Sequence, residues 1–95
     1  MSEIFKPNFS VPAISLTLSA SQVLSAALPS AGYYLVSQYG FGDSVLVGSN
    51  SQSFDFTKGI KLVNGTRDIM YLDNSFISVS ATDYVVVNIN YGTVV

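Results

Sequence analysis

The sequence contains neither cysteine nor histidine in its 95 residues. The lack of cysteine excludes disulfides and thiol nucleophiles, and the lack of histidine removes a common zinc ligand and the imidazole base of acid–base catalysis. A chain of this length forms one domain of ordinary size. Such a domain buries only ~60–65% of the surface that its unfolded chain exposes, so its own core leaves a small stability margin.

Charged residues are also scarce, at 11% of the chain with a net charge of -2, whereas soluble domains typically contain about 25%. No Asp, Glu, Lys or Arg lies between Lys6 and Asp43. A monomer with so neutral a surface tends to associate. We therefore expect part of the surface to be covered by copies of the chain or by a larger assembly. The few basic residues form no patch for nucleic acid.

The uncharged stretch does not have the pattern of a membrane span. Its Ser, Thr and Gln residues fall on every face of a helix, and Pro12 and Pro29 bracket fewer residues than the ~20 apolar ones that a span needs. The start Met1-Ser2-Glu3 also lacks the basic residues that open a signal peptide. We expect neither a membrane segment nor an export signal here.

Alternation of apolar and polar residues predicts an all-β fold. Residues 14–18 alternate cleanly, residues 33–38 are rich in aromatic and β-branched types, and similar runs recur through the second half. Residues 22–28 fit either a strand or one short helical segment. Together these patterns predict a small β-sandwich or jelly-roll-like barrel of seven to nine short antiparallel strands over residues 14–95. Hairpins are expected at Asn64-Gly65 and between residues 76–80 and 84–90.

The glycines of Gly40-Phe41-Gly42 resemble the opening of a phosphate-binding loop. A dinucleotide fingerprint needs a third glycine at the position of Val45 and a helix that begins there, and a P-loop needs a Gly-Lys-Ser/Thr end. In this chain a predicted strand follows the glycines in place of the helix, and no lysine lies nearby. The loop is therefore predicted to connect two strands, and no nucleotide or other cofactor is expected.

Residues 1–13 form a predicted N-terminal arm outside the domain. The arm carries Ile4, Phe5, Phe9 and Val11, while its prolines prevent a regular helix and disfavour a central strand. We expect it to lie extended over a neighbouring subunit or shell, where burial of Phe5 and Phe9 contributes ~1.5–3 kcal/mol each. In the alternative, the arm covers an edge of its own sandwich.

The carboxylates do not form a recognisable catalytic or metal-binding motif. Asp43 and Asp55 are the candidates for a pair of carboxylates across two strands, as glycoside hydrolysis requires. However, Asp43, Asp73 and Asp83 fall in predicted turns, where aspartate accepts hydrogen bonds from local backbone amides. The spacing of calcium-binding loops is absent as well. We therefore expect no enzymatic activity and no metal site.

The six tyrosines leave two interpretations open. They supply stacking faces for a sugar or a host receptor in the end loops of a sandwich, or most of them turn into the core or a subunit interface. Tyr39 and Phe41 flank Gly40 in a predicted loop and are the best candidates for an exposed contact.

Four runs, ALPSAGYYLV, GDSVLVG, LVNGTRDIMYL and ISVSATDYVVVNINYG, resemble the small β-sandwich proteins of bacteriophage virions. The resemblance covers residues 14–92 and rests on strand and turn residues. It implies a virion location and a role in capsid decoration, capsid cementing or a minor spike, commonly as a trimer. The family often closes with Gly-acid-Gly, whereas this chain has Asn90-Tyr91-Gly92, so the C-terminal contact is not carried over.

The sequence therefore predicts a structural virion accessory protein that acts through protein–protein contacts. Its expected partners are copies of itself, as a homotrimer, and the major capsid protein or another virion protein. The expected interface residues are Ile4, Phe5, Phe9, Val11, Tyr39 and Phe41. The alternative is a carbohydrate- or receptor-binding module of a fibre or spike tip that attaches to the host.

Overall fold

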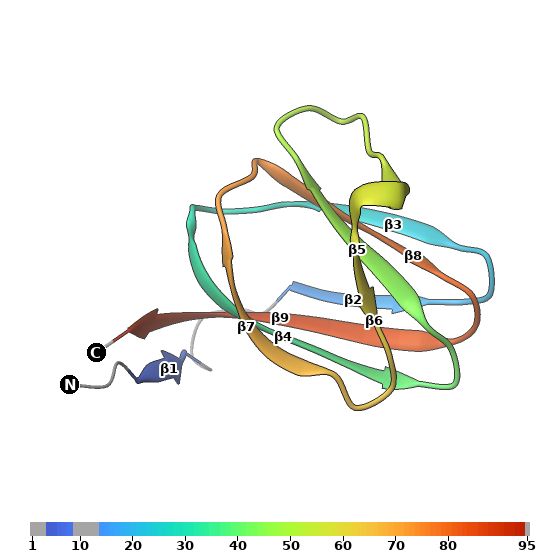
Figure 1. The fold of residues 1–95 in the computed structure, drawn as a ribbon, viewed down its shortest axis with the longest axis horizontal. Helices are drawn as coiled ribbons and strands as arrows, with labels where there is room; N and C mark the ends of the chain where they lie inside the picture. The colour runs from blue at the N-terminus through green and yellow to red at the C-terminus, as the bar shows by residue number, and fades with distance from the viewer. Residues whose placement is uncertain (1–3, 9–13, 95) are drawn as a thin grey trace.

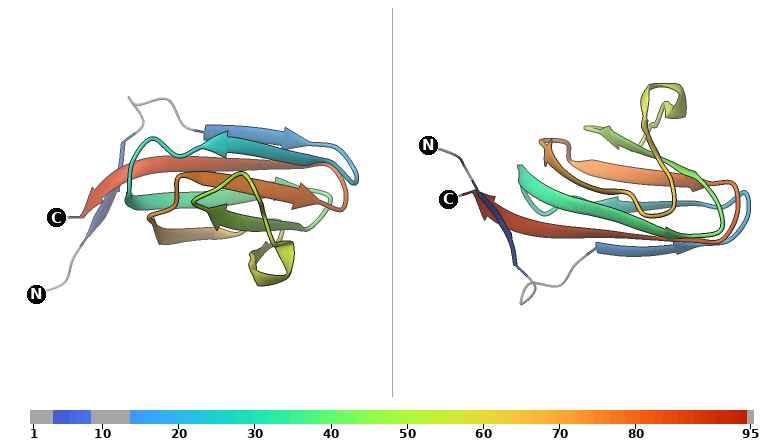
Figure 2. Two further views of the ribbon diagram at one scale, coloured as in Figure 1. Left: turned by 90° about the horizontal axis from the view of Figure 1, so that it is seen from above. Right: turned by 60° about the horizontal axis from the view of Figure 1, so that its bottom comes forward.

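The computed structural model of the protein describes residues 4–8 and 14–94. Within them the chain forms nine strands and one short 3-10 helix, and the strands build two antiparallel sheets that pack as two layers (Figures 1 and 2). The prediction of a small all-β sandwich is confirmed. The elements are β1 (Phe5–Pro7), β2 (Ile14–Leu18), β3 (Val23–Ala27), β4 (Gly32–Gly40), β5 (Ser44–Ser49), η1 (Phe56–Lys58), β6 (Ile60–Leu62), β7 (Arg67–Leu72), β8 (Phe76–Ala81) and β9 (Val85–Val94).

The two sheets have different strand orders. The first has the order β1-β9-β4-β7, with β2 also paired to β9, and the second has the order β3-β8-β5-β6. Strand β9 is long enough to hold two partners in succession: residues 85–89 pair with β2 and residues 92–94 pair with β1. The segment at residues 22–28, ambiguous in the sequence, contains strand β3, which pairs with β8.

From β2 onward, the chain changes sheet at every connection except the one from β5 to β6. The two expected hairpins are therefore wrong. The turn at Asn64-Gly65 leads from β6 in the second sheet to β7 in the first, and the turn at residues 82–84 leads from β8 to β9 in the same direction. Alternation specifies which face of a strand is buried, and an arch between sheets buries that face as well as a hairpin does.

The core lies between the sheets and is formed by alternate residues of the strands. Its fully buried members include Leu18, Leu62, Ile77, Val85 and Val87. Full burial of an aliphatic side chain contributes about 1.5–3 kcal/mol relative to exposure. Tyr34 also lies in this core, where its hydroxyl donates a 2.6 Å hydrogen bond to the backbone carbonyl of Ser30.

The segment between β5 and β6 packs on the outer face of the second sheet and stands out from the strands in Figures 1 and 2. A Cβ atom added at Gly59 would lie 2.3 Å from Cγ1 of Val45 and 2.7 Å from Cγ2 of Val47. This close approach explains why Val47 is buried although it points away from the core.

Candidate interaction surfaces

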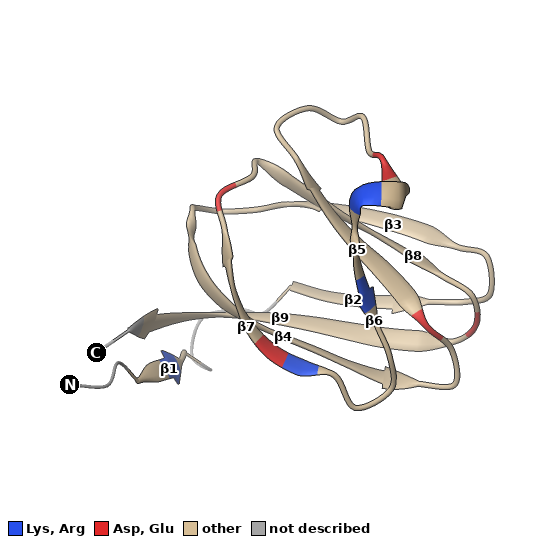
Figure 3. Cartoon of the chain, viewed as in Figure 1, with Lys and Arg blue, Asp and Glu red and all other residues tan. Residues whose placement is uncertain are grey.

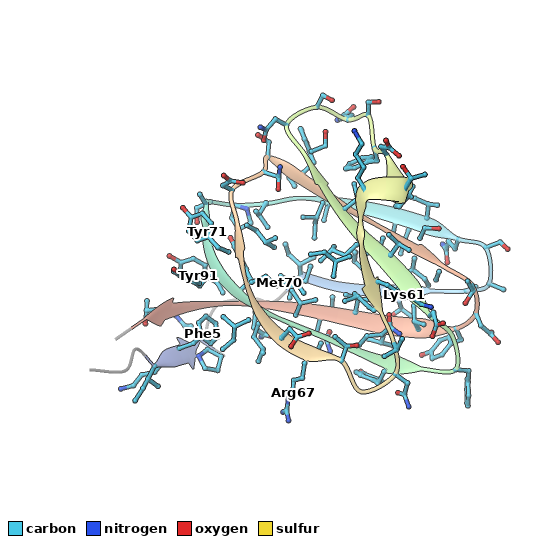
Figure 4. The ribbon with its side chains drawn as sticks, viewed as in Figure 1. Phe5, Lys61, Arg67, Met70, Tyr71 and Tyr91 are labelled. Atoms are coloured by element: carbon cyan, nitrogen blue, oxygen red, sulfur yellow. The ribbon has the colours of Figure 1, made fainter. Side chains whose placement is uncertain are left out.

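The described part of the N-terminal arm lies on its own sandwich. Strand β1 pairs with β9, and the backbone N–H of Asn8 donates a 2.8 Å hydrogen bond to the carbonyl of Tyr91. The Phe5 ring packs over Gly92, where an added Cβ would lie 2.3 Å from the Cζ atom of that ring. Figure 4 shows Phe5 and Tyr91 at this end of the sheet. Residues 4–8 thus adopt the edge-covering arrangement that the sequence left as the alternative.

The other residues of the expected arm interface are less defined. Ile4 is 58% exposed and remains available for a contact with a neighbour. Phe9 and Val11 lie outside the described residues. The burial of these two side chains by a neighbouring subunit, and a domain boundary at residue 13, stay predictions.

Charge divides the edge strands into two kinds (Figure 3). Strand β6 carries Lys61, β7 carries Arg67 and Asp68, and β1, which pairs with β9 beyond β2, carries Lys6, whereas β2 and β3 contain no ionisable side chain. Strands β2 and β3 are joined by the turn at residues 19–22 and contact each other. We call β2 and β3 the uncharged edge pair. Charged side chains, lysine above all, protect edge strands against pairing with other chains, and the uncharged edge pair lacks this protection.

An apolar hollow adjoins the uncharged edge pair on the β3 side. It has a volume of about 490 Å³ and contains no charged residue in its lining, which consists of Ser25, Ala26, Ala27, Gln52, Phe54 and Phe76. Strand β3 pairs with β8 along one side only within the part of the chain that the structure describes. A free edge beside an apolar hollow provides what strand addition requires, namely backbone groups for affinity and a pocket for a side chain.

Tyr39 and Phe41 are both exposed, as the sequence predicts, at 54% and 88%. Tyr84, which the sequence did not single out, joins them at 44% exposure, and its ring centroid lies 6.5 Å from that of Phe41. The sequence carried one signal for Tyr84, its position directly after the turn residue Asp83. Phe41 and Tyr84 form an aromatic corner at one end of the sandwich, and Tyr39 lies two residues before Phe41 near the end of β4. Their role as a contact stays a prediction.

The glycine-rich loop that positions this corner connects β4 to β5. Gly40 has a φ of +135°, and a Cβ there would lie 2.4 Å from the carbonyl oxygen of Tyr84. That carbonyl accepts hydrogen bonds from the N–H groups of Phe41 and Gly42 at 2.8 and 3.4 Å. These hydrogen bonds therefore join the β4–β5 loop to the β8–β9 turn. The loop connects two strands, as the sequence predicts.

Core packing accounts for few of the tyrosines. Tyr34 is buried and Tyr91 is half-buried, with ring centroids 5.4 Å apart. Tyr33 and Tyr71 are exposed and form a second edge-to-face pair at 5.2 Å. Together with Tyr39 and Tyr84, four tyrosines lie at the surface of the isolated chain, so the core holds a minority of them. That most tyrosines lie in the core or in a subunit interface stays a prediction.

Asp43 and Asp55 are engaged with separate partners. Oδ2 of Asp43 lies 3.6 Å from Nζ of Lys61, and both side chains are well exposed, which limits the pair to about 1 kcal/mol or less. Asp55 caps η1: its Oδ1 accepts from the hydroxyl and the backbone N–H of Thr57, and these hydrogen bonds lower the pKa of Asp55. Each carboxylate thus has a local structural role.

The described residues, 4–8 and 14–94, contain no group of three His, Cys, Asp or Glu side chains placed to hold a metal ion. They also contain no helix that is long and apolar enough to cross a membrane.

Comparisons of the chain with protein-family models, with curated proteins and with solved structures give no match. The structure therefore defines a class by fold, that of small all-β sandwiches. The resemblance to bacteriophage virion proteins stays a basis for a proposal.

Proposed function

We propose that the protein is a structural accessory subunit of a virion, of the capsid decoration, cement or spike-base type, that acts through oligomeric protein–protein contacts. The observation that carries the proposal is the uncharged edge pair, β2 and β3. The resemblance of residues 14–92 to virion proteins is the basis for the virion location and for the expected trimer.

The chemistry of the uncharged edge pair favours burial against protein. Its exposed side chains are small or apolar and include Ser15, Thr17, Val23, Ser25 and Ala27. No charge must be desolvated to cover these strands, and desolvation of a charge is the main cost of burying a polar surface. The unpaired backbone groups of an edge strand are themselves satisfied when another strand is added.

Association would also support a fold whose own core is small. A domain of this size leaves a large share of its surface in water, and a closed oligomer gives each copy additional buried area. The charged edges, β6 and β7, remain outside such an interface and keep the assembly soluble.

The proposal is tested by placing lysine on the uncharged edge pair. Thr17 and Ala27 are exposed and lie on β2 and β3, so the variant Thr17→Lys/Ala27→Lys adds charge without removing core atoms. We expect this variant to lose self-association and attachment to virion shells, and to remain folded as a monomer.

The matched control is Ile60→Lys on β6, an exposed position on an edge that already carries a lysine. The control should assemble as the wild type does. Normal assembly of the Thr17→Lys/Ala27→Lys variant, or equal loss of assembly in the control, would refute the role of the uncharged edge pair.

A further inference from the structure

A groove with a volume of about 350 Å³ opens on the outer face of the first sheet. It is lined by Ser37, Gln38, Tyr39, Gly65, Thr66 and Arg67. The groove lies where β4 pairs with β7, the charged edge of this sheet, and is formed by none of the residues of the uncharged edge pair. We call it the β4–β7 groove.

Strand register brings a ring and a cation to the two sides of this groove. Ser37 lies directly opposite Arg67, and Tyr39 follows two residues later on the same outer face of β4. Diagonal neighbours of this kind are about 7–8 Å apart between backbones, within reach of long and aromatic side chains. Tyr39 and Arg67 therefore both line this groove, one from each strand.

Backbone hydrogen bonds hold the floor of the groove in place. The N–H of Gln38 donates to the carbonyl of Thr66 at 3.0 Å, and the N–H of Gly65 donates back to the carbonyl of Gln38 at 2.9 Å. The side chain of Asn64 accepts from the N–H of Gly40 at 3.2 Å. No atom lies within 4 Å of the place where a Cβ of Gly65 would point. The groove is thus preformed and open, which lowers the entropic cost of binding.

The groove offers a cation without an intramolecular partner. Among residues 4–8 and 14–94 the salt bridge found joins Lys61 to Asp43, and Arg67 has none. Figure 4 shows the Arg67 side chain directed away from the body of the sandwich. Asp68 is adjacent in sequence but points to the opposite face of β7, because successive strand residues alternate. A guanidinium in this setting binds a carboxylate through two parallel hydrogen bonds.

Hydroxyl and amide side chains continue from Arg67 across the sheet. The register places Arg67 opposite Ser37, and Ser37 opposite Asn88. With strands spaced ~4.8 Å apart, this polar row extends about 10 Å over three strands. Such a row provides hydrogen-bond donors and acceptors for the hydroxyl groups of a ligand longer than one ring.

We propose that the β4–β7 groove binds an acidic saccharide, a sugar chain with a carboxylate on the unit that enters the groove. Arg67 pairs with the carboxylate, the exposed Tyr39 ring packs against the apolar C–H face of the same sugar unit, and the polar row contacts hydroxyl groups of the next units. This activity is separate from the assembly contact of β2 and β3.

The test is an NMR titration of the ¹⁵N-labelled full chain with three acidic tetrasaccharides, which carry glucuronic, galacturonic or sialic acid, and with a neutral hexose tetrasaccharide. At least one acidic probe should shift the amide signals of residues 37–39 and 65–67. The Arg67→Gln variant should weaken that binding about tenfold or more, and Tyr39→Ala about fivefold. Both side chains are exposed, so both variants should unfold as the wild type does.

The matched control is Lys61→Gln, which removes an exposed cation outside the groove. It should bind as the wild type does. The proposal is overturned if no acidic probe shifts these signals, if the neutral probe binds equally well, or if Lys61→Gln weakens binding as much as Arg67→Gln. The same titration at protein concentrations below and above the onset of self-association separates this proposal from the assembly role, because the groove should bind whether or not the chain associates.

Discussion

The side chain of Gln38 lies fully buried in the sandwich, and its carbonyl oxygen accepts a hydrogen bond from the hydroxyl of Ser44. Its amide nitrogen donates a 3.0 Å hydrogen bond to the carbonyl of Gly42. Gln38 belongs to β4 in the first sheet and Ser44 to β5 in the second. This pair of side chains therefore ties the two sheets together at the connection that presents Tyr39 and Phe41.

Truncation of one partner should be costly because it leaves the other buried and unsatisfied. We expect Ser44→Ala to lower the free energy of unfolding by about 1–3 kcal/mol. The double variant Gln38→Met/Ser44→Ala, which removes both polar side chains, should cost less than the sum of the single changes. Urea denaturation of the wild type, of Ser44→Ala, of Gln38→Met and of the double variant measures the free energies of unfolding. A neutral Ser44→Ala would show that the buried pair contributes no stability.

Gly40 and Gly65 both have positive φ angles, of 135° and 88°, but only Gly40 is crowded. Gly40→Ala should therefore be more destabilising than Gly65→Ala, which we expect to cost about 1 kcal/mol from backbone conformation alone. In Gly40→Ala the new Cβ meets the backbone of Tyr84 at 2.4 Å, and the two connections must separate. Thermal unfolding of both variants gives the comparison. Equal midpoints would mean that the contact to Tyr84 is not required.

The contact between Phe5 and Gly92 gives a test of the position of the N-terminal arm. Gly92→Ala places a Cβ against both the Phe5 ring and the carbonyl of Lys6, so β1 should detach from β9. Hydrogen exchange at the Asn8 amide, which donates to Tyr91, should then speed up by at least tenfold, while amides in the core strands keep their protection. Unchanged protection of Asn8 would contradict the observed docking of β1.

Asp55 gives a pH-dependent local test. The hydroxyl of Thr57, followed by its N–H, lowers the pKa of Asp55 below the ordinary 3.8. A carboxyl whose folded pKa is lowered stabilises the fold above its unfolded pKa, and the contribution is lost as the pH falls through the folded value. Thr57→Val should therefore raise the pKa of Asp55 toward its ordinary value, as followed by NMR of the side-chain carboxyl. An unchanged titration would exclude the hydroxyl as the main cause.

The sequence predicted the fold class because alternation is a local property. The runs at residues 14–18, 33–38 and 76–80 each have one apolar face, and each forms a strand. Which strands pair with each other depends on residues far apart in the sequence. Nothing in residues 62–67 indicates that Asn64-Gly65 turns between sheets, because the same turn residues suit a hairpin.

Only some of the candidate surfaces could be predicted from the sequence. The exposure of Tyr39 and Phe41 follows from their place beside Gly40, and the uncharged edge pair follows from the gap between Lys6 and Asp43 once the strands are edges. The β4–β7 groove could not be predicted from the sequence, because Tyr39 and Arg67 are brought together by strand register. Gln38 lies two residues after Val36 and four after Tyr34, and therefore on the same buried face of β4. The alternation along this strand thus indicated that Gln38 is buried.

The central claim is that the uncharged edge pair of this sandwich is covered by other copies of the chain. Sedimentation equilibrium of the wild-type protein over a wide concentration range tests it most directly. We predict a species of three times the 10.2 kDa chain mass. A single species of 10.2 kDa that persists at the highest concentration would contradict the account.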